Sequence, residues 1–313
     1  MKNHHQYLLD QLSKIDQLSK SSKLSRFFHA PLRYFYLQFY KFIIYPWFKK
    51  AVLKKIRTFW GSEMTLLIPA GADIFLLGAK THDSEIRLSK FLIQQLQPND
   101  LFIDAGAHFG FYSILASHVM ENKGHIFSFD ASQQIFSVLN KNVSDIQSIT
   151  ANHFALCSSN LGQIEFNEFP ILFSEYNTID STHFEQQKWF KNIKPQKIKV
   201  QGTRLDSFLN NNFFNDKKLS SDAKMIVKID VEGAEYEVIK GLTDILTDNQ
   251  FNHPIIIVIE YWGNAKIDSA QNAAVELLKE LGFHSYVIDN DGNLKNLVDF
   301  TMISDSENIV FKR

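Results

Sequence analysis

The sequence has 313 residues, a formal net charge of −1 and 45% hydrophobic residues. This composition is typical of a folded globular protein, and it excludes both a disordered chain and a protein that wraps nucleic acid through an overall basic surface. Because Cys157 is the only cysteine, no intrachain disulfide can form, which favours a reducing, cytoplasmic location. The length exceeds that of a usual single domain, so we expect an N-terminal extension over residues 1–80 and a main domain over residues 81–313.

The extension carries an unusual pattern of charge and aromatic residues. Residues 1–20 are polar and lack the apolar core of a secretory signal. From Gln17 to Ser62 there is no Asp or Glu. The basic residues of this stretch are Lys20, Lys23, Arg26, Arg33, Lys41, Lys49, Lys50, Lys54, Lys55 and Arg57. Its aromatic residues are Phe27, Phe28, Tyr34, Phe35, Tyr36, Phe39, Tyr40, Phe42, Tyr45, Trp47, Phe48, Phe59 and Trp60.

Two interpretations of residues 24–60 stay open. A transmembrane helix needs about 20 nearly uninterrupted apolar residues, and Lys41 and Pro46 break the run. The segment could lie at the inner membrane face as a peripheral contact, with rings at the headgroup boundary and cations on anionic lipid. Alternatively, a stripe such as Phe35 and Phe39 is typical of a helix packed on the main domain or on a second copy in a homo-oligomer. No nucleic-acid motif accompanies these residues, so we expect no nucleic-acid partner.

Two short apolar runs, Met64–Ile68 and Asp73–Leu77, are separated by Pro69 to Ala72 and predict a β-hairpin. The segment Ser84–Leu96 carries apolar residues on one side and is followed by Pro98, which predicts a helix that ends there. These elements lead directly into the first motif.

A strand, a glycine turn and a helix come next. Leu101–Ile103 is a short apolar strand, Phe111–Met120 predicts a helix, and the loop D-A-G-A-H-F-G joins them from Asp104 to Gly110. Gly106 allows the backbone to turn tightly and approach a ligand, and the start of the helix offers free N–H groups. Gly110 relieves crowding where helix meets strand. The third glycine of the dinucleotide fingerprint is missing, so nicotinamide or flavin is less favoured as the ligand.

The following strand ends in an acid. His125–Phe129 leads to Asp130, about twenty positions after Gly110, where a carboxylate can accept hydrogen bonds from both hydroxyls of a ribose. The segment Ser132–Asn142 predicts a helix. Asn152–Leu156 predicts a third strand whose end would face an adenine ring.

With Lys228–Glu235, which runs K-I-D-V-E-G-A-E, these elements in order resemble the FkbM family of S-adenosylmethionine-dependent methyltransferases. The resemblance covers the chain from about Ile86 to Arg313. Further segments that match are Ala155–Cys157 with Gly162 and Phe166, Thr203–Phe208, and Pro254–Glu260. One departure is visible, because the family commonly has Glu-Pro where this chain has Asp130 and Ala131. An aspartate is shorter, and it can still reach vicinal hydroxyls.

The resemblance implies a class I methyltransferase fold, an α/β, Rossmann-like, doubly wound and mostly parallel seven-stranded sheet, here with a helical N-terminal extension. It also implies O-methylation of a hydroxyl on a sugar, a polyketide or another small molecule. The basic aromatic extension is compatible with a saccharide or lipid-linked glycan as the acceptor. The residues expected to bind S-adenosylmethionine are Asp104, Gly106, Ala107, Gly110, Asp130 and Ala155.

Methyl transfer to a hydroxyl needs an aligned acceptor and benefits from a general base. Asp230 ends the predicted fourth strand and is the first candidate for that base. Glu232, Glu235 and Glu260 could join it, and His108 is a further candidate. Glu260 ends the apolar strand 254–259 and should project into the same crevice. Converging carboxylates could also hold Mg²⁺, which takes oxygen ligands, although the sequence assigns no metal ligand.

Other roles stay open for two of these acids, and the remaining chain completes the domain. Glu235 could cap a helix predicted over Tyr236–Leu246, and Glu232 could pair with a surface lysine. The stretch between Pro170 and Lys199 is aromatic without regular periodicity, which predicts a lid or acceptor wall. The predicted elements at the end of the chain are a helix over Asp268–Leu281 and strands over Phe283–Ile288 and Asn308–Phe311.

Two other functions compete with methyl transfer. An NAD-dependent oxidoreductase on a similar fold would bind NAD and no sulfonium. A non-catalytic, membrane-associated cofactor-binding module would carry a degenerate site, and the presence of both Asp230 and Glu260 argues against that. The sequence has no Asn/Asp-Pro-Pro-Tyr motif for a planar nitrogen, so we expect oxygen to be the methyl acceptor.

Overall fold

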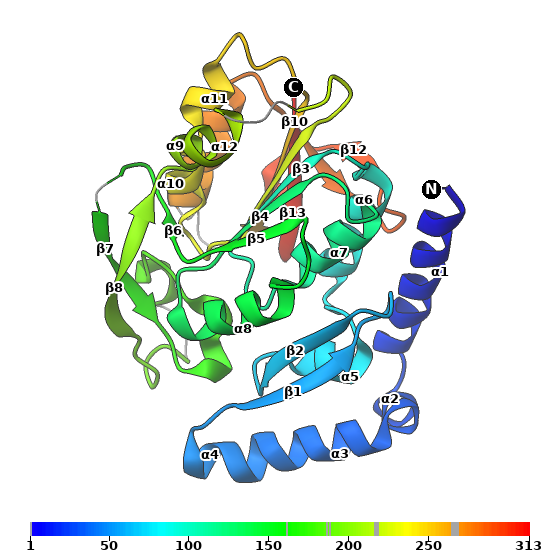
Figure 1. Cartoon of the computed structure of the whole chain (residues 1–313). Coiled ribbons are helices and arrows are strands. Elements are labelled where there is room, and N and C mark those ends of the chain that lie inside the picture. The colour runs from blue at the N-terminus through cyan, green and yellow to red at the C-terminus, as the bar shows by residue number, and fades with distance from the viewer. Residues whose placement is uncertain (1, 161, 186, 188, 216–218, 264–268) are drawn as a thin grey trace.

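The computed structural model describes residues 2–160, 162–185, 187, 189–215, 219–263 and 269–313. A sheet of eight strands crosses the middle of the molecule, and the N-terminal helices lie along one side (Figure 1). In order across the sheet, the strands are β12 (Leu294–Asn296), β11 (His284–Ile288), β13 (Ser306–Lys312), β10 (Ile255–Trp262), β9 (Met225–Ile229), β3 (Leu101–Ala105), β4 (His125–Phe129) and β5 (Ile149–Asn152). The strands from β10 to β5 are parallel, and β13 lies antiparallel between β10 and β11. This is the predicted doubly wound sheet, extended at one edge by the short strand β12.

Helices cover both faces of the sheet, because side chains alternate along each strand between two apolar cores. Phe102 and Ile126 face one core, whereas Ile103 and Val227 face the other. The helices are α6 (Asp83–Gln95), α7 (Phe111–Val119) and α8 (Gln133–Val143) on the first face, and α9 (Leu205–Leu209), α10 (Glu235–Lys240), α11 (Thr243–Thr247) and α12 (Ser269–Glu280) on the second. Burial on both sides explains why the central strands are nearly continuous apolar runs.

Most predicted elements of the main domain are confirmed to within a few residues. The confirmed helices are α6, α7, α8 and α12, and the confirmed strands are β3, β4, β9, β10, β11 and β13. Ser132 caps α8, since its hydroxyl accepts a hydrogen bond from the Ile135 backbone. Asp268, the first residue of the predicted helix near the C-terminus, lies outside the described residues.

The predicted hairpin in the extension is wrong. Its first strand, β2 (Glu63–Ile68), pairs antiparallel with β1 (Val52–Arg57), and its second apolar run forms helix α5 (Ala72–Leu77). Asp73 accepts a hydrogen bond from the next backbone N–H at 2.8 Å, and Gly78 ends the helix in the left-handed conformation with φ 73°. A helix of this length shows no periodicity in the sequence, so it is easily mistaken for a strand.

The predicted third strand also needs correction. The strand β5 ends at Asn152, and the chain then leaves the main sheet. Ala155–Leu156 forms β6 in a second sheet of order β6-β8-β7, beside β8 (Gln196–Thr203) and β7 (Gly162–Glu168). Ala155 and Leu156 pair with the end of β8 in a parallel register, so the apolar run that looked like one strand serves two sheets.

The predicted helix Tyr236–Leu246 is two helices, α10 and α11. It breaks at Gly241, whose carbonyl accepts a hydrogen bond from the Asp206 backbone N–H at 2.9 Å. A side chain at Gly241 would stand 2.2 Å from the Cys157 carbonyl, so only glycine fits this crossing. The remaining short helices are η2 (Ile171–Tyr176), η3 (Thr182–Phe184), η4 (Asn210–Phe214) and η5 (Phe300–Met302).

The N-terminal helices wrap one side of the domain (Figure 1). They are α1 (Lys2–Ser19), α2 (Lys23–His29), α3 (Pro31–Phe39) and α4 (Tyr45–Phe48), with the π-helical turn η1 (Tyr40–Ile44) between α3 and α4. Leu8 and Leu12 are fully buried in the core that contains α6, and Asp16 pairs with Lys90 at 3.4 Å. Within the described residues, no helix has both the length and the apolar character needed to span a bilayer.

Candidate active site

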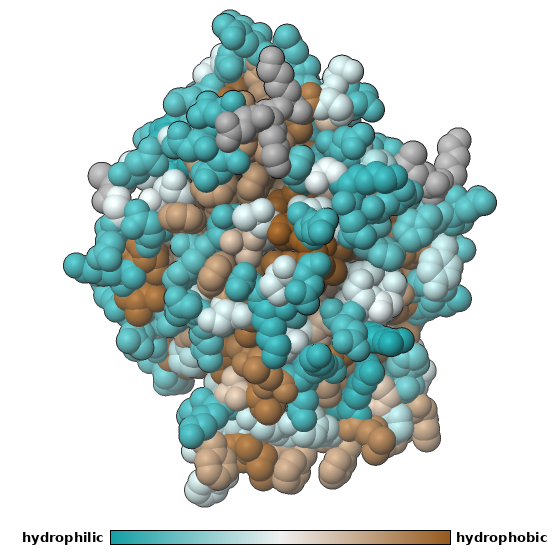
Figure 2. All heavy atoms as spheres, in the orientation of Figure 1, coloured by the Kyte–Doolittle hydropathy of each residue, from teal (hydrophilic) through white to brown (hydrophobic). Residues whose placement is uncertain are grey.

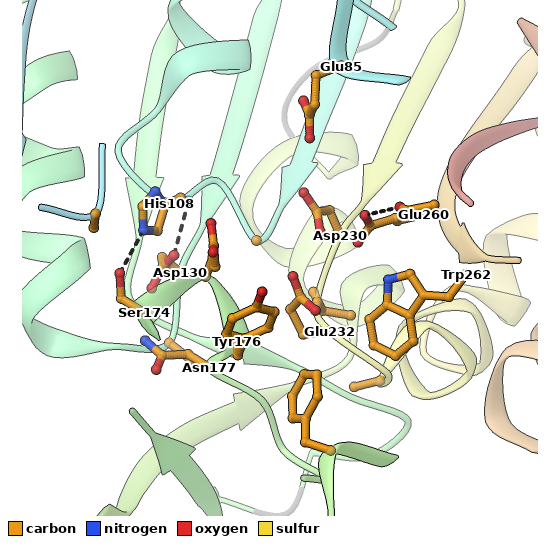
Figure 3. Close-up of a pocket in the computed structure, with 18 of the residues that line it drawn as sticks. Glu85, His108, Asp130, Ser174, Tyr176, Asn177, Asp230, Glu232, Glu260 and Trp262 are labelled. Atoms are coloured by element: carbon orange, nitrogen blue, oxygen red, sulfur yellow. Dashed lines mark hydrogen bonds between the residues drawn. The ribbon is translucent and has the colours of Figure 1, made fainter. Parts of the chain in front are cut away.

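A cavity of about 1200 Å³ opens at the carboxyl ends of β3, β4, β9 and β10 (Figure 3). Ligands of doubly wound sheets bind at this edge. Pockets for one small ligand have volumes of about 300 to 1000 Å³, so this cavity has room for a cofactor and a second molecule. The N-terminal extension contributes to its wall through Gly71, Asp73 and Lys80.

The glycine loop after β3 packs closely against the loop after β9, and both loops line the cavity. Gly106 lines the cavity with φ 75°, and a Cβ atom there would stand 1.8 Å from the Asp230 carbonyl oxygen. Glycine is therefore required at this position by the close packing of the loop after β9, and not only by a ligand in the cavity. Gly110, with φ 86°, is the N-cap residue directly before α7, and a Cβ atom there would stand 2.8 Å from Leu139 of α8. The crowding that Gly110 relieves lies between two helices, whereas the sequence suggested a helix against a strand.

Asp104 lies behind the cavity wall. It is fully buried, accepts a hydrogen bond from Ser113 at 2.6 Å, and pairs with Lys228 at 3.5 Å. Asp104, Ala107 and Gly110 are not among the described residues that line the cavity. Ala107 donates its backbone N–H to the Phe129 carbonyl oxygen at 2.9 Å. Asp104, Ala107 and Gly110 therefore support the conformation of the glycine loop without lining the cavity.

Asp130 lines the cavity directly after β4, as expected for a ribose-binding carboxylate. Its two oxygens accept hydrogen bonds from the backbone N–H groups of Ser132 at 3.0 Å and of His108 at 3.1 Å. These bonds fix the carboxyl group at the loop. Burial raises the pKa of Asp130 to about 7, and the two backbone N–H groups act in the opposite direction.

His108 also lines the cavity, and its Nε2 lies 3.1 Å from the Ser174 hydroxyl (Figure 3). Burial, with help from Lys80, lowers the pKa of His108 to about 3. The imidazole is therefore uncharged at neutral pH, and its Nε2 is already engaged with the Ser174 hydroxyl. The geometry therefore favours a positioning role for His108 over that of the base.

An apolar slot lies beside Asp130, at the ends of β4 and β5. Its cavity-lining residues are Phe129, Ala131, Phe154, Ala155 and Leu156. A flat apolar slot next to a carboxylate suits a purine ring joined to a ribose. Ala155, expected near an adenine, is thus in the wall, although it belongs to the second sheet.

Three carboxyl groups meet at the other end of the cavity, as Figure 3 shows. Asp230 and Glu232 follow β9, and Glu260 lies within β10; each offers an oxygen, and these oxygens lie within 4.8 Å of one another. Glu232 has a left-handed backbone, with φ 55°, followed by Gly233 with φ 92°. The sequence predicted that Glu260 projects into the same crevice as Asp230 and that Glu232 could join them, and the structure brings all three together.

The three acids differ in their charge. Burial opposes ionisation of Asp230, but Lys228, 3.1 Å away, and Lys80 outweigh it and lower the pKa of Asp230. Burial and the negative Asp230 raise the pKa of Glu260 to about 8, and Ser306 donates a hydrogen bond to it at 2.5 Å. Burial and Glu260 also raise the pKa of Glu232 well above its usual range. Near neutral pH, Asp230 is the ionised member of the group.

Glu235 stays outside the cavity wall. Its side chain accepts hydrogen bonds from the backbone of Gly233 at 3.1 Å and of Val231 at 3.4 Å, so it holds the loop that carries Glu232. Glu235 is the first residue of α10, where a carboxylate also interacts well with the helix dipole. Glu232 lines the cavity and approaches other acids, so pairing with a surface lysine is not its role.

Several site residues were not identified from the sequence. Lys228 is 2% exposed and pairs with both Asp104 and Asp230. A lysine inside the apolar strand β9 is the signal that could have pointed to it, since buried lysines are almost always paired. Glu85 and Lys80, which pair at 3.1 Å and line the cavity, lie in segments without a recognisable motif.

An aromatic wall borders one side of the cavity. Tyr176, Phe184 and Trp189 come from the irregular stretch predicted as a lid, and Trp262 ends β10. The Trp189 and Tyr176 rings stack at 4.7 Å between centroids, and Phe184 and Trp262 lie 5.9 Å apart. Within the described part of the stretch, which omits residues 186 and 188, the chain forms η2, η3 and the start of β8.

A model of the FkbM methyltransferase domain matches residues 104–285, more than half of the chain. No curated protein sequence matched the chain. Among solved structures, an FkbM methyltransferase from Methylobacillus flagellatus KT is 11% identical, with 78% of this chain and 53% of that chain covered and a TM-score of 0.41. This chain therefore spans about half the length of that protein.

Two other solved structures illustrate how distant the likenesses are. Fibrillarin from Aeropyrum pernix with bound S-adenosyl-L-methionine is 10% identical, with 72% of this chain and 74% of that chain covered and a TM-score of 0.40. The precorrin-6y C5,15-methyltransferase from Geobacter metallireducens GS-15 is 14% identical, with 73% and 87% covered and a TM-score of 0.38. These values are too low to bear on function.

The residues of the cavity fit S-adenosylmethionine. Asp130 and the apolar slot suit its ribose and adenine, Gly106 leaves room for close approach, and the ionised Asp230 suits its positive sulfonium. The family match covers both the glycine loop and the Asp230 motif, which together build this cavity. The chain belongs to the FkbM methyltransferase family, and it is an S-adenosylmethionine-dependent methyltransferase.

Proposed function

We propose that the enzyme methylates a hydroxyl group of a saccharide or a similar polyhydroxylated small molecule, free or as part of a lipid-linked glycan. The observation that carries this proposal is the carboxyl cluster of Asp230, Glu232 and Glu260 together with the aromatic wall of the same cavity. Carboxyl groups and aromatic faces in one pocket suit the hydroxyl groups and the apolar C–H faces of a sugar ring.

The charge of the cavity favours a neutral acceptor. Among the described lining residues, acids greatly outnumber the single lysine, Lys80. The lining acids are Asp73, Glu85, Asp130, Glu175, Asp230, Glu232, Glu260 and Asp305. Raised pKa values at Glu232 and Glu260 make these groups hydrogen-bond donors near neutral pH, and a protonated carboxyl suits a neutral hydroxyl better than an anion.

Asp230 is the proposed general base. The bound cofactor supplies a methyl group activated on sulfur, which needs no covalent help from the protein. Asp230 would accept the proton of the acceptor hydroxyl as that oxygen takes up the methyl group and S-adenosylhomocysteine is left. Lys228 keeps Asp230 ionised before transfer. Glu260 and Glu232 orient the acceptor, and the rings of Tyr176 and Trp189 exclude water.

A second candidate role for the same carboxyl groups is binding of Mg²⁺. Their oxygens lie within 4.8 Å of one another, and Mg²⁺ prefers oxygen ligands. A cation there would lower the pKa values of Glu232 and Glu260 and could orient an acceptor hydroxyl. Dialysis against EDTA distinguishes the roles, since activity that survives chelation and is unchanged by added Mg²⁺ contradicts the metal role.

The first test separates cofactor binding from catalysis. Calorimetric titration with S-adenosylhomocysteine should show saturable binding, with NAD as the ligand that should not bind. Asp130→Ala should weaken binding about 10- to 100-fold, because it removes charge-assisted hydrogen bonds to the ribose. Asp230→Asn should leave the Kd near that of the wild type.

The second test uses a panel of saccharides and mass-spectrometric detection of methylated product. Asp230→Asn should lower kcat about 10²- to 10⁴-fold, as expected for loss of a general base. Trp189→Ala should raise the acceptor KM with little change in the Kd of S-adenosylhomocysteine. The matched control, Asp291→Asn on the exposed surface, should change neither kcat nor the acceptor KM. Methylation only of amino groups, or an Asp230→Asn variant as active as the wild type, contradicts the proposal.

A further inference from the structure

The outer face of α3, η1 and α4 is an exposed apolar ridge, which we call the aromatic ridge. Leu32 and Trp47 are 84% and 83% exposed, and the ridge also contains Phe35, Phe39, Phe42, Ile43 and Phe48. Figure 2 shows apolar side chains gathered along the lower edge of the molecule, over these helices. Monomeric proteins rarely expose so large an apolar surface unless it contacts another partner.

The opposite face of the same helices is firmly attached to the domain. Leu37, Tyr40 and Tyr45 are buried, and Tyr40 donates its hydroxyl hydrogen to the Lys50 carbonyl at 2.7 Å. The 18 residues from Pro31 to Phe48 are helical throughout and extend about 27 Å at 1.5 Å per residue. The ridge is thus a long, rigid surface that needs no refolding to make a contact.

The chain segment that forms the ridge is positively charged. No Asp or Glu occurs between Gln17 and Ser62. Lys41, Lys49 and Lys50 are exposed within or directly after the ridge. A surface that combines exposed rings with cations and lacks acids is complementary to an anionic, apolar partner.

We propose that the aromatic ridge docks in the headgroup region of an anionic lipid bilayer, with α3, η1 and α4 lying parallel to the membrane plane. A second copy of this chain fits less well. A two-fold interface places the same patch on both sides, so it would bring two acid-free, lysine-rich surfaces face to face. An anionic bilayer accepts both the rings and the cations.

The docked helices would touch the wall of the active-site cavity. The Tyr45 hydroxyl accepts a hydrogen bond from the Leu172 backbone at 3.3 Å, and Leu172 belongs to η2, which supplies Ser174, Glu175 and Tyr176 to the cavity. Membrane docking would therefore act on the segment that lines the acceptor side. The docking itself does not depend on which acceptor is methylated.

The test measures flotation of the full-length protein with vesicles. Wild type should float with vesicles of phosphatidylcholine and phosphatidylglycerol, and less with phosphatidylcholine alone. The variant Phe35→Ser/Phe42→Ser/Trp47→Ser should bind at least tenfold more weakly, as should Lys41→Glu/Lys49→Glu/Lys50→Glu, since each lysine near an anionic surface contributes about fivefold.

A matched control replaces exposed apolar residues elsewhere. Val298 and Met302 are 90% and 78% exposed, and Val298→Ser/Met302→Ser should float like the wild type. Binding of S-adenosylhomocysteine checks that every variant is folded. The proposal is overturned if folded wild type fails to float, or if the control variant loses as much binding as the ridge variant. It is also overturned if the ridge variant floats normally but changes from dimer to monomer in sedimentation velocity, which would assign the ridge to a second copy.

Discussion

Asp230, Glu232 and Glu260 cannot all be ionised near neutral pH, because like charges at such short separation and in a partly buried site repel one another. Lys228 decides which of them carries the charge, since it lies 3.1 Å from Asp230. Asp104 in turn pairs with Lys228 at 3.5 Å and is fully buried. The acid of the glycine loop thus acts on the proposed base through Lys228, and Asp104 is a positioning residue.

The raised pKa of Glu260, about 8, predicts how stability depends on pH. The folded protein holds this proton more tightly than the unfolded chain, so the stabilisation is complete below pH about 4.5 and is lost as pH rises towards 8. Glu260→Gln cannot ionise. Its stability relative to the wild type should therefore increase between pH 6 and pH 9 by roughly 2–3 kcal/mol, since each pH unit below the folded pKa is worth about 1.4 kcal/mol, or by about 5–10 °C in Tm.

Thermal unfolding of the ligand-free protein at both pH values measures this difference. Glu276→Gln, at an exposed position on α12, serves as the control. Its stability should differ from that of the wild type by the same amount at pH 6 and at pH 9. A wild type that gains stability relative to Glu260→Gln as pH rises would contradict the raised pKa of Glu260.

Individual site residues differ in how far the sequence revealed them. Gly106 and Asp130 stand directly after apolar strands, and the doubly wound fold brings such positions to one edge. Lys80 and Glu85 reach the same cavity from segments outside the sheet. Their role depends on how the extension packs, which no local pattern records.

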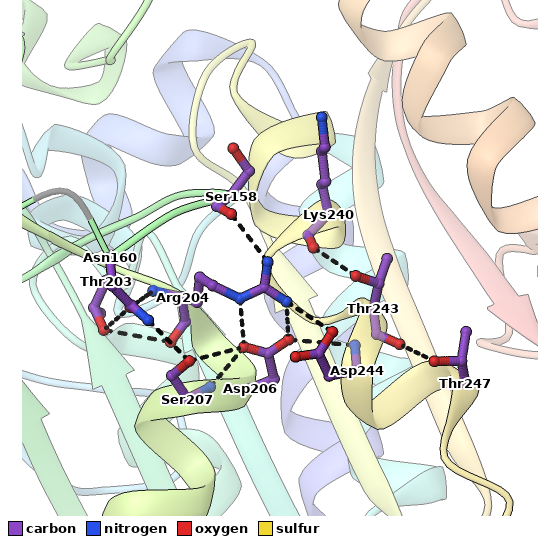
Figure 4. Close-up of polar contacts among 10 residues, drawn as sticks. All are labelled: Ser158, Asn160, Thr203, Arg204, Asp206, Ser207, Lys240, Thr243, Asp244 and Thr247. Atoms are coloured by element: carbon purple, nitrogen blue, oxygen red, sulfur yellow. Dashed lines mark hydrogen bonds and ion pairs between the residues drawn. The ribbon is translucent and has the colours of Figure 1, made fainter.

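An ion-pair network centred on the buried Asp206 joins the end of the second sheet to helices α9 and α11 (Figure 4). Asp206 is fully buried and pairs with Arg204, which also pairs with Asp244 at 3.1 Å and donates a hydrogen bond to the Ser158 carbonyl at 3.0 Å. The network fixes the end of β8 to α9 and α11. None of its described side chains lines the active-site cavity.

Arg204→Ala should therefore lower stability without changing cofactor binding. It leaves the buried Asp206 carboxylate without its cation, although the backbone N–H groups of Ser207 and Asp244 still bond to it, and such a loss costs about 1–3 kcal/mol. Urea denaturation measures the loss, and titration with S-adenosylhomocysteine should give the wild-type Kd. Lys197→Ala removes an exposed pair with Glu165 and should cost less than about 1 kcal/mol. Equal losses in the two variants would show that the network contributes no more than a surface pair.

The elements that the sequence predicted wrongly share a physical cause. Helix α5 is short, and its Asp73 and Gly78 signals are those of a turn as much as of a helix. The break at Gly241 depends on a hydrogen bond from Asp206, far away in the sequence. Long, periodic or fully buried segments such as α6 and β10 were predictable because their pattern is set by local burial alone.

The whole molecule shares its apolar interior between the extension and the main domain. Leu8 and Leu12 of α1 and Leu66 of β2 lie in one core with Phe91 and Phe109. The extension also supplies part of the cavity wall. The boundary expected at residue 80 stays a prediction about sequence organisation, but the packing indicates that the two parts do not unfold separately.

Calorimetry of the full chain should therefore show one cooperative transition, with equal calorimetric and van't Hoff enthalpies. S-adenosylhomocysteine binds only the folded state, so a concentration of about 100 times its Kd should stabilise by about 2.7 kcal/mol and shift the entire transition upward. Removal of residues 1–79 would expose Phe109, which lies close to Gly71, and the face of α6 against which α1 packs, and the remaining chain should aggregate or lose cooperative unfolding. Two separate transitions, of which only the later one responds to the ligand, would instead identify the extension as an independent unit that folds without the catalytic domain.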